Sequence, residues 1–336
     1  MRLRFFLACT LLAGLALVQP SAASSLRGVK PPDRKIPRYD RVFVIVEENH
    51  GYDSILQASG APNLRRLAQT YGNATRFYAE RHPSEPNYIA MISGSTHGIG
   101  DDASFAVNAI DAPNLATQLE ANRLSWGGYF GGYDPARPNA TFTLGYYASK
   151  HNPFMNFTNL RREPNFYSHM HNMNRLPADL GTGTVPNFTF IVPGECDDMH
   201  GVPIACGNDA AEVSRGDSTA ANIVSEIQNS AFWRSPKNAA IVITWDENDD
   251  AHRENGVQGC CGGLPGGGRI PTIVITNHGR RAVRDDTAYN HYSLLRTIED
   301  AFGIYQYLGG ADNWAVGIRP MLPLFSSAPT TSATAM

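Results

Sequence analysis

Charged residues are scarce in this sequence. Asp, Glu, Lys and Arg make up 18% of the 336 residues, and the formal net charge is only -3, whereas an average soluble domain is about one quarter charged. A coiled coil, a long helical bundle or a charged disordered chain needs more charge than this. A protein that binds polyanions by net charge needs the opposite sign. The composition therefore excludes these classes and predicts no nucleic-acid binding.

Cysteine is also scarce, with five in the chain. Cys9 lies in the apolar N-terminal stretch, and the other four are Cys196, Cys206, Cys260 and Cys261. An even number in an exported chain suggests disulfides. Cys196 and Cys206 bracket a short loop and form a plausible pair, the adjacent Cys260 and Cys261 could bridge only with strain, and crossed pairs remain possible. Because two CxxC pairs are absent, a four-cysteine zinc site is disfavoured.

The N-terminus has the pattern of an export signal. Arg2 and Arg4 precede an apolar stretch from residue 5 to 18, and small residues follow at 21–23, as a cleaved secretory signal requires. The stretch is shorter than the roughly 20 residues of a membrane span. We therefore predict a signal peptide over residues 1–23, a periplasmic or secreted protein, and no stable membrane anchor.

Short apolar, β-branched runs alternate with helical patterns along the chain. This alternation predicts an α/β fold, a three-layer sandwich in which helices cover both faces of a central, mostly parallel sheet. The expected strands are 41–47, 187–192, 239–245 and 270–276, and the expected helices are 62–71, 87–92, 114–122, 218–228 and 292–302.

One domain over residues 39–325 accommodates all of these elements. A polar, proline-rich tether at 24–38 precedes it, and a tail expected to be disordered follows at 326–336. Residues 131–175 are rich in Asn, Tyr, Phe, Met and His without clear periodicity, so we expect an insertion that roofs a site. The glycine-rich residues 249–269 are typical of a mobile loop.

Polar residues directly follow the predicted strands. Glu48 and Asn49 follow the first strand, and Asp246 and Glu247 follow the third. In parallel sheets, ligands bind beyond the carboxyl ends of the strands. Three carboxylates and an amide placed there repel each other unless a cation lies among them, and a divalent metal prefers such oxygen ligands. The alternative is that these side chains face solvent or cap helices.

A second group of candidate ligands contains histidine. Asp197, Asp198 and His200 follow the second strand, and His291 begins the last helical pattern. A mixed Asp and His set suits zinc or another transition metal. Either aspartate could face the site. We also expect the polar pair 277–278, after the fourth strand, to lie at the same edge.

The segment HPSEPNY, residues 82–88, contains a candidate nucleophile. Ser84 is suited to cap a helix, and Pro86 suits its first turn. The unpaired backbone N–H groups of a helix N-terminus favour anions. Beside a metal, Ser84 could lose its proton and attack phosphorus. The alternative is a serine that only caps the helix.

Five motifs occur in order between about residues 40 and 305: EENHGYDSI, HPSEPNYIAMISGSTHGI, CDDMHG, TWDEND and YNHYSLLRTIEDAFGI. Together they resemble the secreted phosphoesterase family. This family contains bacterial acid phosphatases, phosphatidylinositol 3-phosphatase-like enzymes and phosphatidylcholine-type phospholipases C, and it belongs to the alkaline phosphatase superfamily. The resemblance implies an alkaline-phosphatase-like fold.

The resemblance also implies roles for single residues. Ser84 takes the position of the phosphate-accepting nucleophile, and Asn87 the position whose amide holds a phosphate oxygen. Divalent metal, whether Ca, Mg, Mn or Zn, is implied at Glu48, Asn49, Asp198, His200, Asp246, Glu247 and His291. Gly201 departs from the aspartate expected in many relatives, and Asp217 could also belong to the site.

The implied function is that of an acid-phosphatase-like phosphomonoesterase acting through a phosphoserine. Its substrate would be a phosphate ester, with a phospholipid or phosphoinositide headgroup as one possibility. The alternatives are a phospholipase C or phosphodiesterase of the same family, which is usually longer, and, more distantly, a serine esterase. The segment 216–218 (GDS) resembles an element of some lipases, but the sequence has no GxSxG.

Overall fold

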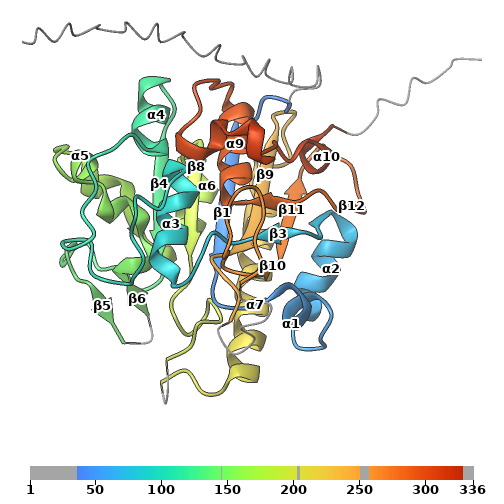
Figure 1. Ribbon diagram of the computed structural model, residues 1–336, viewed down its shortest axis with the longest axis horizontal. Coiled ribbons are helices and arrows are strands. Elements are labelled where there is room, and N and C mark those ends of the chain that lie inside the picture. Colours follow the sequence, from blue (N-terminus) through green and yellow to red (C-terminus); the bar gives the residue numbers. More distant parts are fainter. Residues whose placement is uncertain (1–35, 145, 203–204, 250–256, 328–336) are drawn as a thin grey trace, which may run out of the picture. The chain divides into compact units, whose positions relative to one another are not determined.

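The computed structural model describes residues 36–144, 146–202, 205–249 and 257–327 (Figure 1). The predicted signal peptide, most of the predicted tether and nearly all of the predicted tail lie outside these residues. The end of the tether is packed against the domain. Ile36 is buried, and the Arg38 carbonyl accepts a hydrogen bond from Asn238 Nδ2 at 2.8 Å.

An eight-stranded sheet forms the centre of the fold, in the order β12-β2-β11-β9-β1-β8-β4-β7. The bounds are β1 Arg41–Glu47, β2 Gly72–Ala74, β4 Trp126–Phe130, β7 Met170–Asn172, β8 Phe188–Val192, β9 Ala239–Trp245, β11 Thr272–Thr276 and β12 Val283–Asp285. Strand β1 pairs in parallel with β8 and β9, and β4 pairs in parallel with β8 and β7. The prediction of a mostly parallel central sheet is confirmed.

Strand β11 runs antiparallel to its neighbours β9 and β2. Its polar tail therefore lies at the edge where β9 begins, since Asn277 Oδ1 accepts a hydrogen bond from Ala239 N at 2.9 Å and His278 Nε2 lies 2.9 Å from the Ser235 carbonyl. The expectation that these two residues join the other strand ends was wrong. An apolar run indicates a buried strand but not its direction.

Helices cover both faces of the sheet. Helix α3 (Ser84–Ser93) packs against α9 (His291–Phe302) and α4 (Leu115–Ala121), while α7 (Asp209–Asn229) packs against α2 (Pro62–Thr70) and α6 (Leu176–Thr182). Alternate side chains of a strand point to opposite faces. The other helical segments are α1 Tyr52–Leu56, α5 Thr158–Arg161 and α10 Leu322–Phe325, with short 3₁₀ turns η1 Ser149–His151, η2 Pro153–Asn156, η3 Phe166–His169, η4 Met173–Arg175, η6 Gly309–Asp312 and η7 Trp314–Val316.

Residues 131–175 form a chain of short elements. They include the two-stranded sheet of β5 (Phe142–Thr143) and β6 (Tyr147–Ala148), and they end in strand β7 of the central sheet and turn η4. Turns η1 and η2 pack directly on α3. A further small sheet joins β10 (Arg269–Ile270), β3 (Phe77–Tyr78) and β13 (Tyr289–Asn290). Within the described ranges, no helix combines the length and apolar character that a membrane span needs.

Candidate active site

Ser84 lies where the two central strands end. It is the first residue of α3, one position later than the predicted cap, and it is 1% exposed. Its Oγ lies 3.2 Å from Glu48 Oε2, 3.2 Å from Glu247 Oε1 and 3.5 Å from Asn49 Oδ1. The structure thus brings the candidate nucleophile together with side chains from both predicted pairs.

Strand register explains why the two pairs meet. Strands β1 and β9 are parallel neighbours, and Glu47 is paired with Trp245, the last residue of β9. Glu48 and Asp246 therefore leave the sheet at the same level. The Asn49 N–H donates to Asp246 Oδ1 at 3.2 Å, which connects the two strand ends directly.

Asn87 holds the loop that carries Ser84. Its Oδ1 accepts hydrogen bonds from the backbone N–H groups of Glu80 and Arg81 at 3.0 and 3.1 Å. Its Nδ2 donates to the carbonyls of Arg81 and Pro83 at 2.8 and 3.1 Å. The side chain is fully buried. These bonds give Asn87 a positioning role, while contact with a phosphate oxygen stays a prediction.

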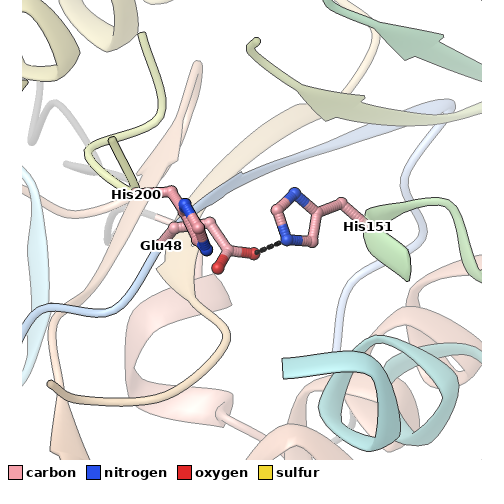
Figure 2. A group of neighbouring side chains, drawn as sticks. All are labelled: Glu48, His151 and His200. Atoms are coloured by element: carbon pink, nitrogen blue, oxygen red, sulfur yellow. Dashed lines mark ion pairs between the residues drawn. The ribbon is translucent and has the colours of Figure 1, made fainter. Parts of the chain in front are cut away.

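Glu48, His151 and His200 form a second group beside Ser84 (Figure 2). One potential ligand atom from each lies within 4.8 Å of the others. His151 Nε2 lies 3.3 Å from Glu48 Oε1, and His151 Nδ1 lies 3.8 Å from Asp198 Oδ2. The His200 ring places Nδ1 2.7 Å from the Gly201 carbonyl. If Nδ1 is the protonated nitrogen, Nε2 keeps its lone pair for a ligand.

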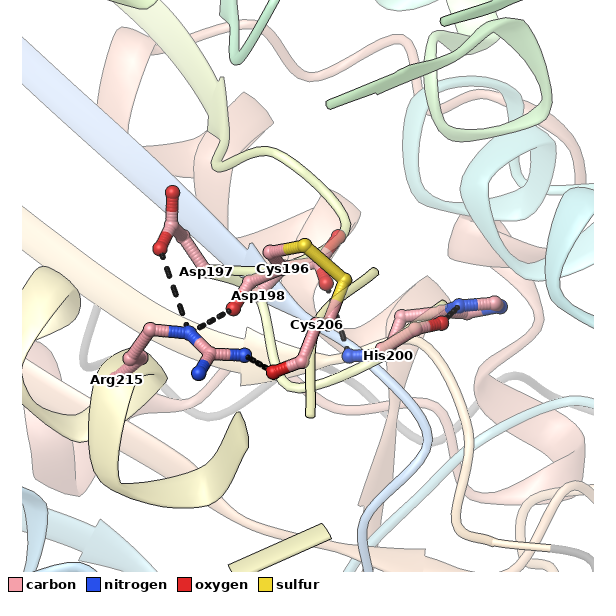
Figure 3. Close-up of a disulfide and its surroundings, with 7 residues drawn as sticks. Cys196, Asp197, Asp198, His200, Cys206 and Arg215 are labelled. Carbon is pink, nitrogen blue, oxygen red and sulfur yellow. Dashed lines mark hydrogen bonds and ion pairs between the residues drawn. A yellow bond between two sulfur atoms is a disulfide. The ribbon is translucent and has the colours of Figure 1, made fainter. Parts of the chain in front are cut away.

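A disulfide loop presents Asp198 and His200 (Figure 3). Cys196 and Cys206 are bonded, and Arg215 of α7 donates to the carbonyls of both cysteines, at 2.9 Å to Cys196. Asp197 lies on the Arg215 side, with Oδ1 4.0 Å from Arg215 Nε. Asp198 is fully buried and faces the site. Of the two aspartates between which the sequence left the choice open, Asp198 is therefore the one that faces the site.

Two histidines lie outside the group around Glu48 and belong to a second flank of Ser84, defined by its contact with Glu247. His82 Nδ1 contacts Glu247 Oε2. His291 Nδ1 lies 2.8 Å from Glu80 Oε2, and its Nε2 lies 2.9 Å from the Trp245 carbonyl. Asp198 and His200, which the sequence groups with His291, are instead gathered around Glu48. The metal role of His291 stays a prediction.

Three further polar side chains complete the surroundings of Ser84. The Tyr88 hydroxyl donates to Glu48 Oε1. Asp102 accepts a hydrogen bond from the Glu85 N–H in the first turn of α3 at 2.9 Å, and its other oxygen lies 2.9 Å from Lys150 Nζ. Burial alone would lower the pKa of Lys150, but the charges of Glu48 and Asp102 raise it. Lys150 therefore remains a cation beside the carboxylates.

Burial sets the electrostatics of this site. Removal from water raises the pKa of Glu48 and of Asp198 well above the ordinary carboxyl range, and the neighbouring Asp246 raises both further. Burial also raises the pKa of Asp246 to about 6 and that of Glu247 to about 8. Burial lowers the pKa of His151, which favours the neutral imidazole that binds metals.

The arrangement of these atoms fits a cation. Asp198 Oδ2 is buried and accepts no hydrogen bond from the described residues, and the single Ser84 proton faces three acceptor oxygens. Buried carboxylates are stable when they are paired or when they coordinate a metal. The residues that could hold a divalent ion are Glu48, Asn49, His151, Asp198, His200, Asp246 and Glu247.

Asp217 and Ser218 have structural roles in α7. Asp217 accepts hydrogen bonds from the N–H groups of Asn63 and Leu64, at 3.2 and 2.8 Å, and so satisfies the first turn of α2. Ser218 is exposed and donates to the Ser214 carbonyl at 2.9 Å. Both serve the helices rather than the site around Ser84.

Comparison with known proteins identifies the family. A model of the phosphoesterase family matches residues 54–305. The chain belongs to the phosphoesterase family. The prediction of a phosphoric ester hydrolase is confirmed at the level of this family.

This phosphoesterase is similar to curated enzymes over most of its length. It is 31% identical over 272 residues to the phosphatidylinositol-3-phosphatase of Mycobacterium tuberculosis, which covers 80% of this chain and 79% of the relative. It is 26% identical over 298 residues to the acid phosphatase of Aspergillus fumigatus, covering 86% of this chain and 59% of the fungal enzyme. The chain therefore spans less than two thirds of the fungal relative.

The fold of this phosphoesterase matches a solved structure of the alkaline phosphatase superfamily. That protein, from Vibrio parahaemolyticus, aligns with a TM-score of 0.53 and 13% identity, covering 88% of this chain and 71% of its own. At this identity the likeness concerns the fold alone. The predicted alkaline-phosphatase-like architecture is confirmed.

Proposed function

We propose that this phosphoesterase is an exported, metal-dependent phosphomonoesterase of the acid phosphatase type. The observation that carries the proposal is the position of Ser84. Its hydroxyl lies at the start of a ten-residue helix and within 3.5 Å of oxygens from Glu48, Asn49 and Glu247. The names of the two curated relatives support a phosphate monoester as the substrate class.

The carboxylates, amide and imidazoles around Ser84 would hold the divalent metal, whether Ca, Mg, Mn or Zn. When bound, the metal supplies positive charge that favours the deprotonated serine and offsets the charge of the phosphoryl group. Glu48 is central to this set because it contacts Ser84 on one side and His151 on the other.

Ser84 performs the covalent step. Its hydroxyl gives its proton to one of the carboxylates that it contacts, and Oγ forms a bond to phosphorus as the ester P–O bond breaks. The departing alcohol oxygen takes up a proton, for which we assign His82, the neighbour of Glu247. Water then attacks phosphorus, gives a proton back to His82 and releases phosphate, while Ser84 Oγ regains its proton.

Lys150 contributes positive charge beside the phosphoryl group. Lys150 Nζ is tied to Asp102, which also accepts the Glu85 N–H. Fixed donors and cations that are already oriented toward developing charge contribute strongly to such reactions.

Export is supported by the chemistry of the cysteines. Both Cys196–Cys206 and Cys260–Cys261 are bonded in the described part of the chain, and such bonds persist in oxidising compartments. The predicted signal at residues 1–23 agrees with this location. We propose a periplasmic or secreted enzyme.

The test compares two serines. Ser84→Ala is expected to lower hydrolysis of p-nitrophenyl phosphate by about a thousandfold or more, while the exposed Ser218→Ala serves as the matched control and keeps wild-type turnover. Chelation of divalent metal should abolish the wild-type activity and re-addition should restore it. An acid quench followed by peptide mass spectrometry should locate phosphate on Ser84.

Three outcomes would contradict the proposal. Retained turnover in Ser84→Ala would remove this residue as the nucleophile. Activity that survives thorough chelation would remove the metal. Hydrolysis of p-nitrophenyl acetate that is lost in Ser218→Ala would instead indicate the esterase alternative.

A further inference from the structure

A cavity of about 660 Å³ adjoins the flank of Ser84 that carries His82. One wall is formed by Arg81 and His82, the residues that lead into α3. The rest of the lining comes mainly from the loop around Leu264 and from the segment that contains Val316. His82 is shared between the cavity and the site because its Nδ1 contacts Glu247, whose Oε1 lies 3.2 Å from Ser84 Oγ.

The cavity combines polar residues on the side of Glu80, Arg81 and His82 with a group of apolar side chains. Val257, Leu264 and Val316 line it and are 53%, 76% and 41% exposed. Pro265 and Ile318 add further hydrocarbon to the lining. Isolated exposed apolar residues are common on protein surfaces, but a group of them around one hollow marks a binding surface.

Backbone hydrogen bonds hold the cavity wall against the segment that precedes Ser84. The Ala79 N–H donates to the Gly268 carbonyl and the Gly267 N–H donates to the Ala79 carbonyl, each at 3.0 Å. The Cys260–Cys261 bond closes the chain at the turn that leads to Gly262. The wall and the catalytic loop are thus fixed to each other, as a preformed ligand pocket requires.

We propose that this cavity binds the hydrocarbon part of the leaving alcohol, so that the enzyme prefers phosphomonoesters of apolar alcohols. The inference rests on the proposed function and names its substrate class. Ser84 must reach the phosphoryl group, and the adjoining hollow beside His82 offers the apolar side chains of Val257, Leu264 and Val316 to the rest of the substrate. The other flank carries the buried side chains of Tyr88 and His151, beside the carboxylates that we assign to the metal.

A second apolar surface makes the proposal falsifiable. The hairpin of β5 and β6 exposes Phe142, Leu144 and Tyr146, at 52%, 61% and 59%. It belongs to residues 131–175, which the sequence suggests as a roof over the site. If this hairpin bound the hydrocarbon, substitutions there would change the preference, and substitutions in the cavity would not.

The experiment uses n-alkyl phosphates from ethyl to hexyl. Their leaving alcohols have nearly the same acidity, so differences in kcat/KM report contacts of the chain rather than leaving-group chemistry. Each methylene that is at least half transferred from water is expected to raise kcat/KM about two- to fourfold. Hexyl phosphate should therefore exceed ethyl phosphate by about tenfold or more in the wild-type enzyme.

Cavity variants are compared with a hairpin variant. Val316→Asp and Leu264→Asp should bring the hexyl-to-ethyl ratio close to one, because a carboxylate in the wall opposes burial of hydrocarbon. Phe142→Asp should keep the wild-type ratio. Thermal unfolding of each variant shows whether the fold is preserved. Because Leu264 is more exposed than Val316, Leu264→Asp is expected to disturb the fold less than Val316→Asp.

The outcomes separate this inference from the proposed function. Two results would overturn the cavity assignment while hydrolysis of ethyl phosphate stands. One is a kcat/KM that does not change from ethyl to hexyl phosphate in the wild-type enzyme. The other is a hexyl-to-ethyl ratio of kcat/KM that falls in Phe142→Asp and persists in both cavity variants. Failure of the wild-type enzyme to hydrolyse any monoester would instead overturn the proposed function itself.

Discussion

The two flanks of Ser84 present different surroundings to the same hydroxyl. On one flank, Glu48, His151 and Asp198 are each at most 3% exposed, and His151 lies 3.3 Å from Glu48 and 3.8 Å from Asp198. On the other flank, Glu247 contacts His82, and His82 borders the 660 Å³ cavity. Both flanks carry ionisable side chains, but one is closed, whereas the other opens onto a hollow with apolar side chains on its wall.

This difference suggests a division of tasks. Electrostatic interactions strengthen where water is excluded, so the closed flank suits the metal and the phosphoryl charge. The open flank can accept alcohols of different size without disturbing that charge. A hydrolase that must fix one phosphoryl geometry and release varied products gains from keeping the two tasks apart.

The largest expected effect tests the closed flank at its centre. Glu48→Gln removes the carboxylate shared by Ser84 and His151 and should lower both bound divalent metal and kcat, the latter by about a thousandfold. Glu247→Gln, on the open flank, should lose less metal. Metal content of the purified, folded variants is measured by atomic spectrometry beside turnover. Wild-type metal content in Glu48→Gln would contradict the assignment of metal binding to the closed flank.

A pair of histidine variants should separate the flanks next. His151→Asn should weaken metal binding and slow every substrate alike. His82→Asn should keep the metal but slow ethyl phosphate about a hundredfold more than p-nitrophenyl phosphate, because only the alkyl alcohol needs protonation as it leaves.

The control is the ratio of kcat/KM for ethyl phosphate to kcat/KM for p-nitrophenyl phosphate, measured in the same enzyme preparation. An equal loss on both substrates in His82→Asn, with metal retained, would show that His82 acts by positioning Glu247. A substrate-dependent loss in His151→Asn would show that the flanks are not distinct.

Much of the fold is predictable because buried parallel strands are continuous apolar runs. Strands β1 and β9 occur over the predicted residues 41–47 and 239–245. The polar residues that follow these two strands are therefore identifiable as candidate site residues from the amino-acid pattern alone. Strand β4 was missed, since its sequence WGGYF contains two glycines, which are poor indicators of a strand.

His151 was not predicted because no local pattern indicates its role. It ends the short turn η1 within a stretch that lacks periodicity, and it reaches Glu48 only because η1 packs on α3. Similarly, His82 and Lys150 acquire their roles through contacts with Glu247 and Asp102 that are distant in sequence. Such long-range pairs require tertiary structure, because a motif does not indicate which residue of another motif its side chains contact.

The smallest expected effect concerns the cation at the margin of the closed flank. Near neutral pH, a phosphomonoester carries more negative charge than a diester with the same leaving group. Lys150→Met should therefore reduce kcat/KM for p-nitrophenyl phosphate about tenfold or more. The reduction should be smaller for the diester methyl p-nitrophenyl phosphate. Lys150→Arg should restore most of the loss, and the exposed Lys237→Met is the matched control. Equal losses on both esters would mean that Lys150 acts only by holding Asp102 against the first turn of α3, in which case Asp102→Asn should reproduce the same profile.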